Sequence, residues 1–168
     1  YRENFDRIIS AAHGDQALHL LASPTKLETE VLSAFPYQAN KATLHTDSQF
    51  MPHTKRCWAS WNYRVDGDKH STIYWMNSLQ GATAEKEFFV SINPSRKIPI
   101  EHIIKELEYD HPLFNLKSIA AQKEVPKLNA ADTGRYFCGA WQRFGFHEDG
   151  LWSAFRLCKQ LLGRNPWS

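Results

Sequence analysis

Two runs rich in aromatic and β-branched residues flank a glycine turn in the stretch RCWASWNYRVDGDKHSTIYWMNSL, residues 56–79. Such runs are typical of β-strands, and Asp66-Gly67 supplies the positive backbone angles that a tight hairpin turn needs. Similar runs lie on either side, at residues 42–46 and 87–92. Connections this short join neighbouring antiparallel strands. The central part of the chain therefore predicts an antiparallel sheet of about four or more strands.

Helical patterns precede this central region. Residues 7–12 are compatible with a strand, and apolar residues then recur at helical spacing up to Leu21. Ser23 and Pro24 have the residue types of an N-cap and a first helical position, which predicts a second helix through Leu32. The fold class predicted for the chain is α+β, with helices packed against the antiparallel sheet.

Further elements are predicted after the central region. Apolar residues share one helical face over residues 100–107, and a second helix is predicted over residues 119–123, ended by Pro126. Residues 135–141 predict a strand. Apolar residues at helical spacing then predict an amphipathic helix over residues 151–162.

Charge, cysteine and hydropathy patterns exclude several classes of protein. Lys plus Arg is 20 against 18 Asp plus Glu, and neither sign forms a long block, so nucleic acid is not expected as a partner. The three cysteines lack C-x-x-C spacing and the eight histidines form no H-E-x-x-H, so no metal site is predicted. No apolar run approaches the ~20 residues of a membrane-spanning helix. These patterns favour a cytoplasmic protein without a membrane span.

The stretch YFCGAWQRFGFHEDGLWSA, residues 136–154, is the most informative about chemistry. Its order is strand, glycine-bearing turn and helix start. A helix start has unpaired N–H groups and the positive end of the helix dipole, which stabilise a phosphate or the negative charge of a reduced flavin. Glycines in the turn let the backbone approach a flat ring. The alternative is a plain N-cap, in which Asp149 satisfies free amides at the helix start.

The same stretch resembles the C-terminal flavin-contacting motif of the flavin-containing amine oxidases and related desaturases. The likeness is strongest to the bacterial branch of predicted NAD/FAD-binding proteins, in which a Phe-Cys-Gly-Ala run precedes Gly-Phe-His-Glu-Asp-Gly. Four further phrases match in order and spacing, so the resemblance covers nearly the whole chain: AHGDQAL (12–18), LHTD (44–47), WASWNY (58–63) and YWMN (74–77).

This resemblance implies that the chain contributes to a site for FAD. The residues that would border the flavin, with amides near the last two facing its pyrimidine edge, are Gly139, Ala140, Gly145, Phe146, His147, Glu148, Asp149, Gly150 and Leu151. The aromatic sheet would cover the flavin, as in the substrate domain of amine oxidases, with a substrate lining of Trp58, Trp61, Asn62, Tyr63, Tyr74, Trp75 and Asn77. Lys41 would hold a water against flavin N5, although an exposed lysine is the ordinary interpretation.

The resemblance also implies a piece of a longer bacterial enzyme. No G-x-G-x-x-G follows a strand, so the pyrophosphate cradle of FAD is missing, and an N-terminal dinucleotide-binding half is expected as its partner. Residues 1–22 would end an FAD-domain strand and its connecting helix, residues 23–130 would form the substrate domain, and residues 131–168 would carry the flavin motif. The parent would remove a hydride from a small amine or apolar substrate; this piece alone is expected to be inactive.

A binding module without catalysis is the alternative hypothesis. Strand alternation places Trp61 and Tyr63 on one face of the sheet and Trp58, Ser60 and Asn62 on the other, so one face is suited to an apolar ligand or a protein partner. Aromatic residues at such positions are also ordinary core residues. An upstream strand, G-x-G-x-x-G and helix would favour the enzyme, and a natural start near Tyr1 would favour the module.

Overall fold

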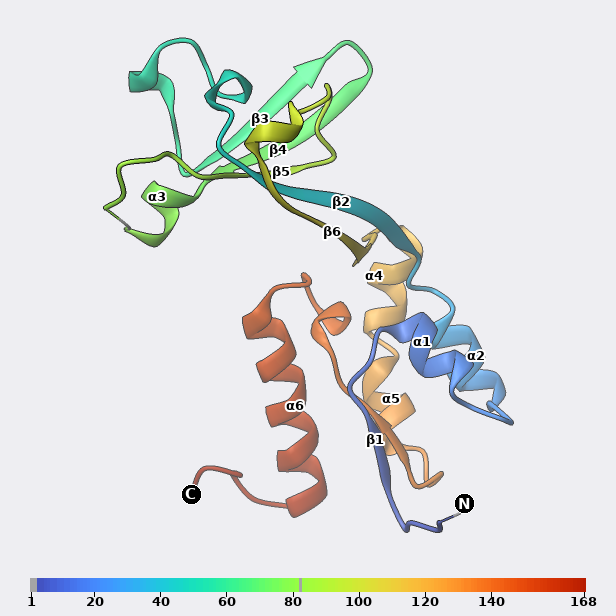
Figure 1. The fold of residues 1–168 in the computed structure, drawn as a ribbon. Coiled ribbons are helices and arrows are strands. Elements are labelled where there is room, and N and C mark those ends of the chain that lie inside the picture. Colours follow the sequence, from blue (N-terminus) through green and yellow to red (C-terminus); the bar gives the residue numbers. More distant parts are fainter. Residues whose placement is uncertain (1–2, 82) are drawn as a thin grey trace. The chain divides into compact units, whose positions relative to one another are not determined.

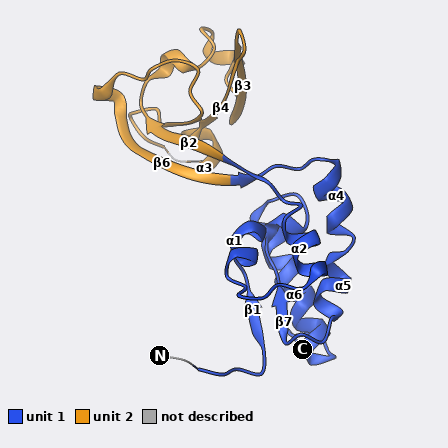
Figure 2. Cartoon of the chain, turned by 90° about the vertical axis from the view of Figure 1, so that its right-hand side faces the viewer, with its two compact units in different colours: residues 1–38, 111–168 blue, residues 39–110 orange. Residues whose placement is uncertain are grey.

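The chain divides into two compact units (Figure 2). The computed structural model describes residues 3–81 and 83–168. One unit comprises residues 1–38 and 111–168, and the other comprises residues 39–110. Each has its own hydrophobic core and is described separately. The functional boundaries expected after residues 22 and 130 concern domains of a parent enzyme and stay a prediction.

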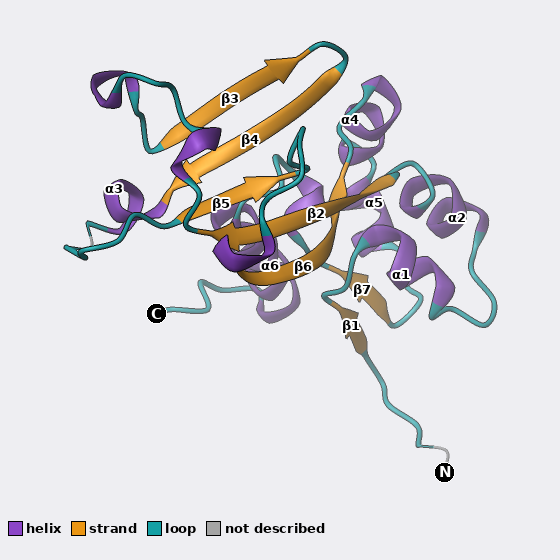
Figure 3. Cartoon of the chain, turned by 45° about the horizontal axis from the view of Figure 1, so that its top comes forward, coloured by secondary structure: helices purple, strands orange, loops and turns teal. Residues whose placement is uncertain are grey.

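A five-stranded sheet forms the unit of residues 39–110 (Figures 1 and 3). Its strand order is β3-β4-β5-β2-β6, with bounds β2 Tyr37–His45, β3 Trp61–Asp66, β4 Lys69–Trp75, β5 Phe89–Ile92 and β6 Ile103–Pro112. Trp61 lies opposite Tyr74 in the antiparallel β3–β4 pair, and β5 pairs antiparallel with both β4 and β2. The predicted α+β fold with an antiparallel sheet and packing helices is confirmed. The turn at Gly67 has the positive φ, 59°, expected of this hairpin.

The helix predicted over residues 100–107 is wrong. After a 3₁₀ turn at Ile100–His102, the chain continues as β6 at the edge of the sheet beside β2. The apolar residues that suggested a helical face do not form a common buried face, since Ile104 is 52% and Leu107 37% exposed. Pairing with β2 satisfies backbone groups of β6, and this tertiary pairing outweighs the helical spacing.

The two strands predicted within residues 56–79 both stop short of the outer ends of that stretch. The second, β4, ends at Trp75, where α3 (Met76–Gln80) begins. The first, β3, begins at Trp61, after a 3₁₀ turn at Lys55–Cys57. Both breaks bring an indole against the core of this unit. That core consists of Phe50, Met51, Ile73, Phe89 and Ile98, with Trp58, Trp75 and Ile103 packed against it.

Within its described residues, the other unit combines a two-stranded parallel sheet with five α-helices (Figure 1). Strands β1 (Ile8–Ser10) and β7 (Arg135–Phe137) pair with Ile9 opposite Tyr136. The helices are α1 Gly14–His19, α2 Lys26–Leu32, α4 Leu116–Gln122, α5 Val125–Ala130 and α6 His147–Leu162. A shared core, which includes Phe35, Leu128, Phe137 and Trp141, joins β7 to α1, α2, α4 and α5. Across the described residues, no helix is long and apolar enough to cross a membrane.

The ends of three elements in this unit differ from the prediction. Helix α2 is capped by Thr25 rather than Ser23, because the Thr25 hydroxyl accepts from the Glu28 amide at 3.2 Å while the Glu28 carboxylate accepts from the Thr25 amide at 2.6 Å. Pro126 lies in the first turn of α5 instead of ending α4. The strand predicted over residues 135–141 stops at Phe137, before the chain turns.

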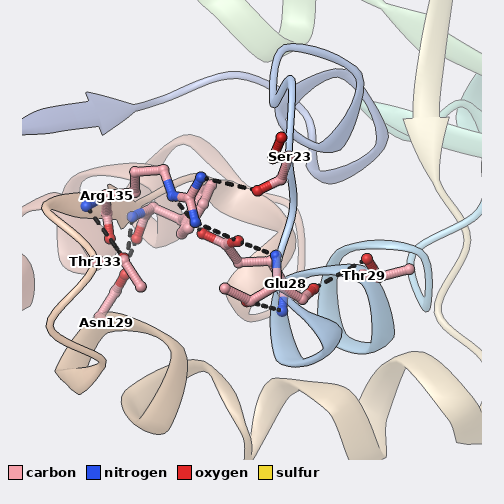
Figure 4. A network of polar contacts seen from close by, with 8 residues as sticks. Ser23, Glu28, Thr29, Asn129, Thr133 and Arg135 are labelled. Carbon is pink, nitrogen blue, oxygen red and sulfur yellow. Dashed lines mark hydrogen bonds and ion pairs between the residues drawn. The ribbon is translucent and has the colours of Figure 1, made fainter.

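A buried ion pair joins α2 to β7 (Figure 4). Arg135 Nε lies 2.8 Å from Glu28 Oε1, and Arg135 Nη2 donates to Glu28 Oε2 at 2.9 Å. Arg135 Nη1 also donates to the carbonyl of Ser23 at 3.2 Å. The Glu28 side chain is only 2% exposed, so either charge would be costly to leave unpaired. The pair therefore fixes the strand that leads into the candidate site.

Candidate functional site

The candidate site lies where the two parallel strands end. Beyond β1 the chain passes through Ala12, and beyond β7 it passes through Gly139; Trp141 Nε1 donates to the Ala12 carbonyl at 3.2 Å and ties the two segments together. Helix α6 begins after the same turn. Ligands of parallel sheets bind outside the carboxyl ends of the strands, and a helix start there attracts negative charge. The residues from Gly139 to Leu151 all belong to this end of the unit.

Gly139 occupies a position that requires glycine. Its φ is +154°, and a Cβ added there would lie 2.5 Å from Trp141 Nε1. Its amide donates to the Ser153 hydroxyl at 2.8 Å, which connects the strand end to α6. Next to it, the side chain of Asn129 exchanges two hydrogen bonds with the backbone of Phe137, both at 2.8 Å. The end of β7 is thus held from α5 and from α6.

The turn between β7 and α6 is closed by Asp149. This side chain, only 4% exposed, accepts hydrogen bonds from the amides of Phe144 at 3.2 Å and Phe146 at 3.0 Å. Arg143 lies 3.7 Å from its carboxylate and extends over the ring of Trp152. The bulky Arg143-Phe144 pair therefore has a structural role in holding the turn against the helix.

Helix α6 starts earlier than predicted, at His147 instead of after Gly150. The Gly150 amide donates to the Phe146 carbonyl at 3.2 Å and is already part of the helix. The amides at the open end belong to His147 and Glu148, both exposed. The amides near Gly150 and Leu151, predicted to face the flavin pyrimidine edge, therefore lie inside α6, and that contact stays a prediction. Asp149 does bind free amides, as the N-cap alternative held, but they belong to the turn that precedes the helix.

Two buried polar atoms near the strand ends have no hydrogen-bond partner among the described residues: Ser10 Oγ and His13 Nδ1. The His13 ring stacks on Tyr37 with centroids 4.5 Å apart and planes 12° from parallel. The Tyr37 hydroxyl accepts from the Gly14 amide at 2.9 Å, and burial raises the pKa of Tyr37 to about 12. Buried polar atoms without partners are costly, so such atoms at a strand end favour a ligand or solvent site.

These residues fit one wall of a flavin site. A Cβ at Gly150 would make only an ordinary van der Waals contact with Ala140, at 3.9 Å, so a small side chain would fit beside the first turn of α6. The unpartnered atoms, the helix start and the strand ends supply donors and acceptors for the polar edge of a flat ring. The sequence supplies no pyrophosphate cradle, so the fit is confined to the flavin end of FAD.

The aromatic residues expected to line a substrate cavity divide into two groups, both in the unit of residues 39–110. Trp61 and Tyr63 are 52% and 56% exposed, and their rings stack with centroids 6.1 Å apart. Trp58 and Trp75 instead meet edge-on at 5.3 Å, against the core. Trp61 and Tyr63 share one face of β3 as predicted, whereas Trp58 lies before that strand begins. The partly buried Trp58 and Trp75 take the core role that aromatic residues ordinarily have.

The remaining lining candidates are mostly held by local contacts. Asn62 donates to the carbonyls of Ala59 at 2.6 Å and Ile73 at 3.3 Å. Asn77 accepts from the Phe88 amide at 2.7 Å and donates to the carbonyl of Lys86 at 2.9 Å. Both asparagines therefore fix loops of the sheet. Tyr74 lies half-buried on β4, opposite Trp61.

Lys41, the lysine expected near flavin N5, lies on β2. Its ammonium group is 2.8 Å from Glu106 Oε1, and its side chain is 50% exposed. These contacts are those of an exposed ion-paired lysine, the ordinary interpretation of this position.

His45 is the most deeply buried histidine of the sheet, fully enclosed beside Phe50 and Phe89. Its Nε2 lies 2.8 Å from Ser91 Oγ, and its Nδ1 accepts from the Asp47 amide at 3.2 Å. An Nδ1 that accepts leaves the proton on Nε2, so His45 donates to Ser91 and cannot take its proton. Burial lowers the pKa of His45 to about 4. This pair is structural, not nucleophilic. No group of side chains within the described ranges has the arrangement of a metal site.

Sequence reasoning missed His13 and Tyr37 as parts of the site. His13 follows the first predicted strand directly, which is the usual place for ligand-binding residues in a parallel sheet. That position was therefore a usable signal. Tyr37 gave none, since its stacking on His13 depends on how α1 and α2 fold back.

Comparison with protein-family models finds no match for this chain, and a search of curated proteins finds none.

Proposed function

We propose that this chain supplies the flavin-facing strand ends and a substrate-domain sheet to an FAD-dependent oxidoreductase of the amine-oxidase and desaturase type. One observation carries the proposal: α6 starts after the carboxyl end of a parallel strand pair whose ends also hold Ser10 Oγ and His13 Nδ1, two buried atoms without a hydrogen-bond partner among the described residues. That is the place and the chemistry expected of a cofactor site in a parallel sheet.

The parallel pair also supports a missing partner half. Parallel sheets occur almost only as larger sheets covered on both faces, whereas β1 and β7 form a sheet of two strands. Both Ile8 and Ile9, which alternate between the faces of β1, are about half exposed, at 57% and 49%. Further strands of a dinucleotide-binding half would bury such residues. We therefore assign the pyrophosphate cradle to that half, expected in the same bacterial, cytoplasmic protein.

The chemistry that FAD supplies when bound is acceptance of a hydride from a C–H bond next to nitrogen or carbon in an amine or apolar substrate. The residues of this chain would hold the flavin ring and orient the substrate. The amides of His147 and Glu148 at the start of α6 stabilise negative charge on the polar ring edge. Gly139 lets the strand end approach closely, and Asp149 keeps the turn in place. The exposed Trp61 and Tyr63 present an apolar surface for substrate.

The test is an absorbance spectrum of the whole protein that contains this chain, beside the chain alone. We expect flavin bands between about 370 and 450 nm in the whole protein and none in the chain alone. Gly150→Ala should reduce flavin content while the helix is kept, because the added methyl group makes only an ordinary contact with Ala140 at 3.9 Å. Lys159→Ala, also on α6, is the control. A colourless whole protein that takes up no added FAD would overturn the proposal.

A non-catalytic binding module is the second candidate, and one observation favours it. The stacked rings of Trp61, Tyr63 and His70 form an exposed row on β3 and β4, with neighbouring centroids 6.1 and 5.8 Å apart. Monomeric proteins seldom expose contiguous aromatic surface without a partner. If the whole protein lacks flavin, this row is the better guide to its function.

A further inference from the structure

We propose that the unit of residues 39–110 binds an amphiphilic anion, a carboxylate or phosphate on an apolar body. The site is a surface pocket of about 1000 Å³, here called the basic pocket, whose characteristic residues are Lys41, Lys69, Arg96, Lys97, Ile100 and Ile103. Its volume suits a small organic ligand. This proposal is independent of the flavin proposal, because it concerns a pocket formed by this unit alone.

Positive charge is concentrated in the basic pocket. The unit as a whole has as many acidic as basic residues, yet the pocket lining contains four basic side chains and one acidic side chain, Glu106. Charges of one sign gathered in a concave surface raise the local concentration of the opposite ion. The segregation within a neutral unit therefore favours an anionic ligand.

Two of the four cations are available to a ligand. Lys41 is paired with Glu106 at 2.8 Å, and Arg96 donates to the carbonyl of Gln49 and lies 4.7 Å over the ring of Phe50. In the part of the chain that the structure describes, Lys69 and Lys97 have no acidic group within ion-pair distance.

The neighbouring acid Asp66 does not neutralise these two lysines. It is bound by Arg64 Nε at 2.6 Å and by the Ser95 hydroxyl. These contacts hold the pKa of Asp66 at about 2, so Arg64 is the cation that this carboxylate compensates. The excess positive charge of the pocket thus rests on Arg96, which is held by Gln49 and Phe50, and on Lys69 and Lys97.

The wall that presents Lys97 is fixed in place before any ligand binds. Asn93 has a positive φ of 49°, which is uncommon outside glycine. Its amide donates to the Lys41 carbonyl at 2.8 Å, and its side-chain oxygen accepts from the Lys41 amide at 2.9 Å. The buried Ser71 hydroxyl donates to the Asn93 carbonyl at 2.9 Å and accepts from the Ser95 amide at 2.8 Å. A pre-formed wall of this kind lowers the entropy cost of binding.

Part of the pocket lining is apolar. Ile98 is buried at 4% exposure and anchors the segment to the core, whereas Ile100, two residues later, is 83% exposed. Ile103, which is half-buried, also lines the pocket. Lysines and an exposed isoleucine in one pocket match a ligand that has both a charge and an apolar body. A purely polar anion would leave Ile100 without a contact.

The experiment is calorimetric titration of the 168-residue chain with octyl phosphate, octanoate, inorganic phosphate and octyl glucoside. We expect both octyl anions to bind more tightly than octyl glucoside or inorganic phosphate. Lys69→Gln/Lys97→Gln should weaken the better octyl anion by about tenfold, since two exposed charge contacts are lost. The control Lys86→Gln/Lys105→Gln removes the same charge outside the pocket and should leave binding unchanged.

One further variant tests the contribution of the ligand's apolar part, and one further probe tests whether the ligand is a single molecule or a membrane surface. Ile100→Ser, at an exposed position that folding tolerates, should weaken the octyl anions and not inorganic phosphate. Equal affinity for octyl glucoside, an equal loss in both double lysine variants, or no binding would each overturn the proposal. Vesicles of phosphatidylglycerol distinguish a membrane surface from a single ligand: binding to vesicles without binding to the free octyl anions would also overturn it.

Discussion

The Ser153 hydroxyl accepts a hydrogen bond from the Gly139 amide at 2.8 Å and donates one to the Gly150 carbonyl at 2.7 Å. One side chain, 2% exposed, thus joins the end of β7 to the first turn of α6. Ser153→Ala should lower the free energy of unfolding by roughly 1–3 kcal/mol, because the Gly139 amide loses its acceptor. Urea denaturation followed by circular dichroism measures the change. Ser23→Ala, at an exposed serine, is the control and should change stability by less than about 0.5 kcal/mol.

Gly139→Ala should lower the free energy of unfolding by more than Ser153→Ala does. The added Cβ would lie 2.5 Å from Trp141 Nε1, at a backbone angle that side chains rarely adopt. We expect the Trp141 indole to leave the Ala12 carbonyl and the fluorescence of the native protein to change. A variant with the wild-type spectrum and stability would show that the strand ends adjust freely, against the rigid arrangement described above.

The Glu28–Arg135 pair leads to a prediction about paired and single substitutions. Glu28→Gln or Arg135→Met alone should destabilise the protein by about 3–5 kcal/mol, because each leaves a buried charge without its partner. The double variant should cost less than the sum of the two. The exposed pair Lys26–Glu30, 3.7 Å apart, offers the matched cycle and should give a coupling below about 1 kcal/mol. Additive effects at Glu28 and Arg135 would contradict the coupling inferred from Figure 4.

The buried His45 should make stability depend on pH in a defined window. Burial lowers its pKa from 6.5 to about 4, so the folded protein favours neutral imidazole while the unfolded chain binds a proton more readily. The contribution of neutral His45 to the free energy of unfolding is complete above about pH 6.5. It is lost as the pH falls toward 4, by about 3 kcal/mol in total.

Unfolding of the wild type and of His45→Gln, measured between pH 7 and pH 4, isolates this contribution. The wild type should lose more stability than the variant over that interval, because only the wild type has the imidazole. Parallel pH profiles of the two proteins would show that His45 does not titrate as its burial requires.

How much of this molecule was predictable depends on where the determining contacts lie. The β3–β4 hairpin was predictable because Asp66-Gly67 and the flanking aromatic residues act locally. Strand β6 was not, because its conformation depends on pairing with β2, far away in sequence. The start of α6 was misplaced for a related reason: Asp149 closes a turn that lies before the helix, and the sequence of polar residues alone does not reveal which amides it binds.

The candidate site shows the same division. The segment from Gly139 to Leu151 could be identified from its residue types, since a glycine turn before a helix has a local signature. The stacking of His13 on Tyr37 and the fixed wall at Asn93 depend on segments that meet only after folding. Single-sequence reasoning therefore identified the candidate segment by its residue types and missed the contacts that form only on folding.

The sheet formed by β1 and β7 also affects how the isolated chain should behave at high concentration. Strand β1 has one strand neighbour among the described residues, and its Ile8 and Ile9 are largely solvent-accessible. An unprotected apolar strand edge is a template for pairing with another molecule, and nature usually blocks such edges with charge or proline. The isolated chain should therefore self-associate at high concentration through the edge of β1. Ile9→Lys should reduce that self-association.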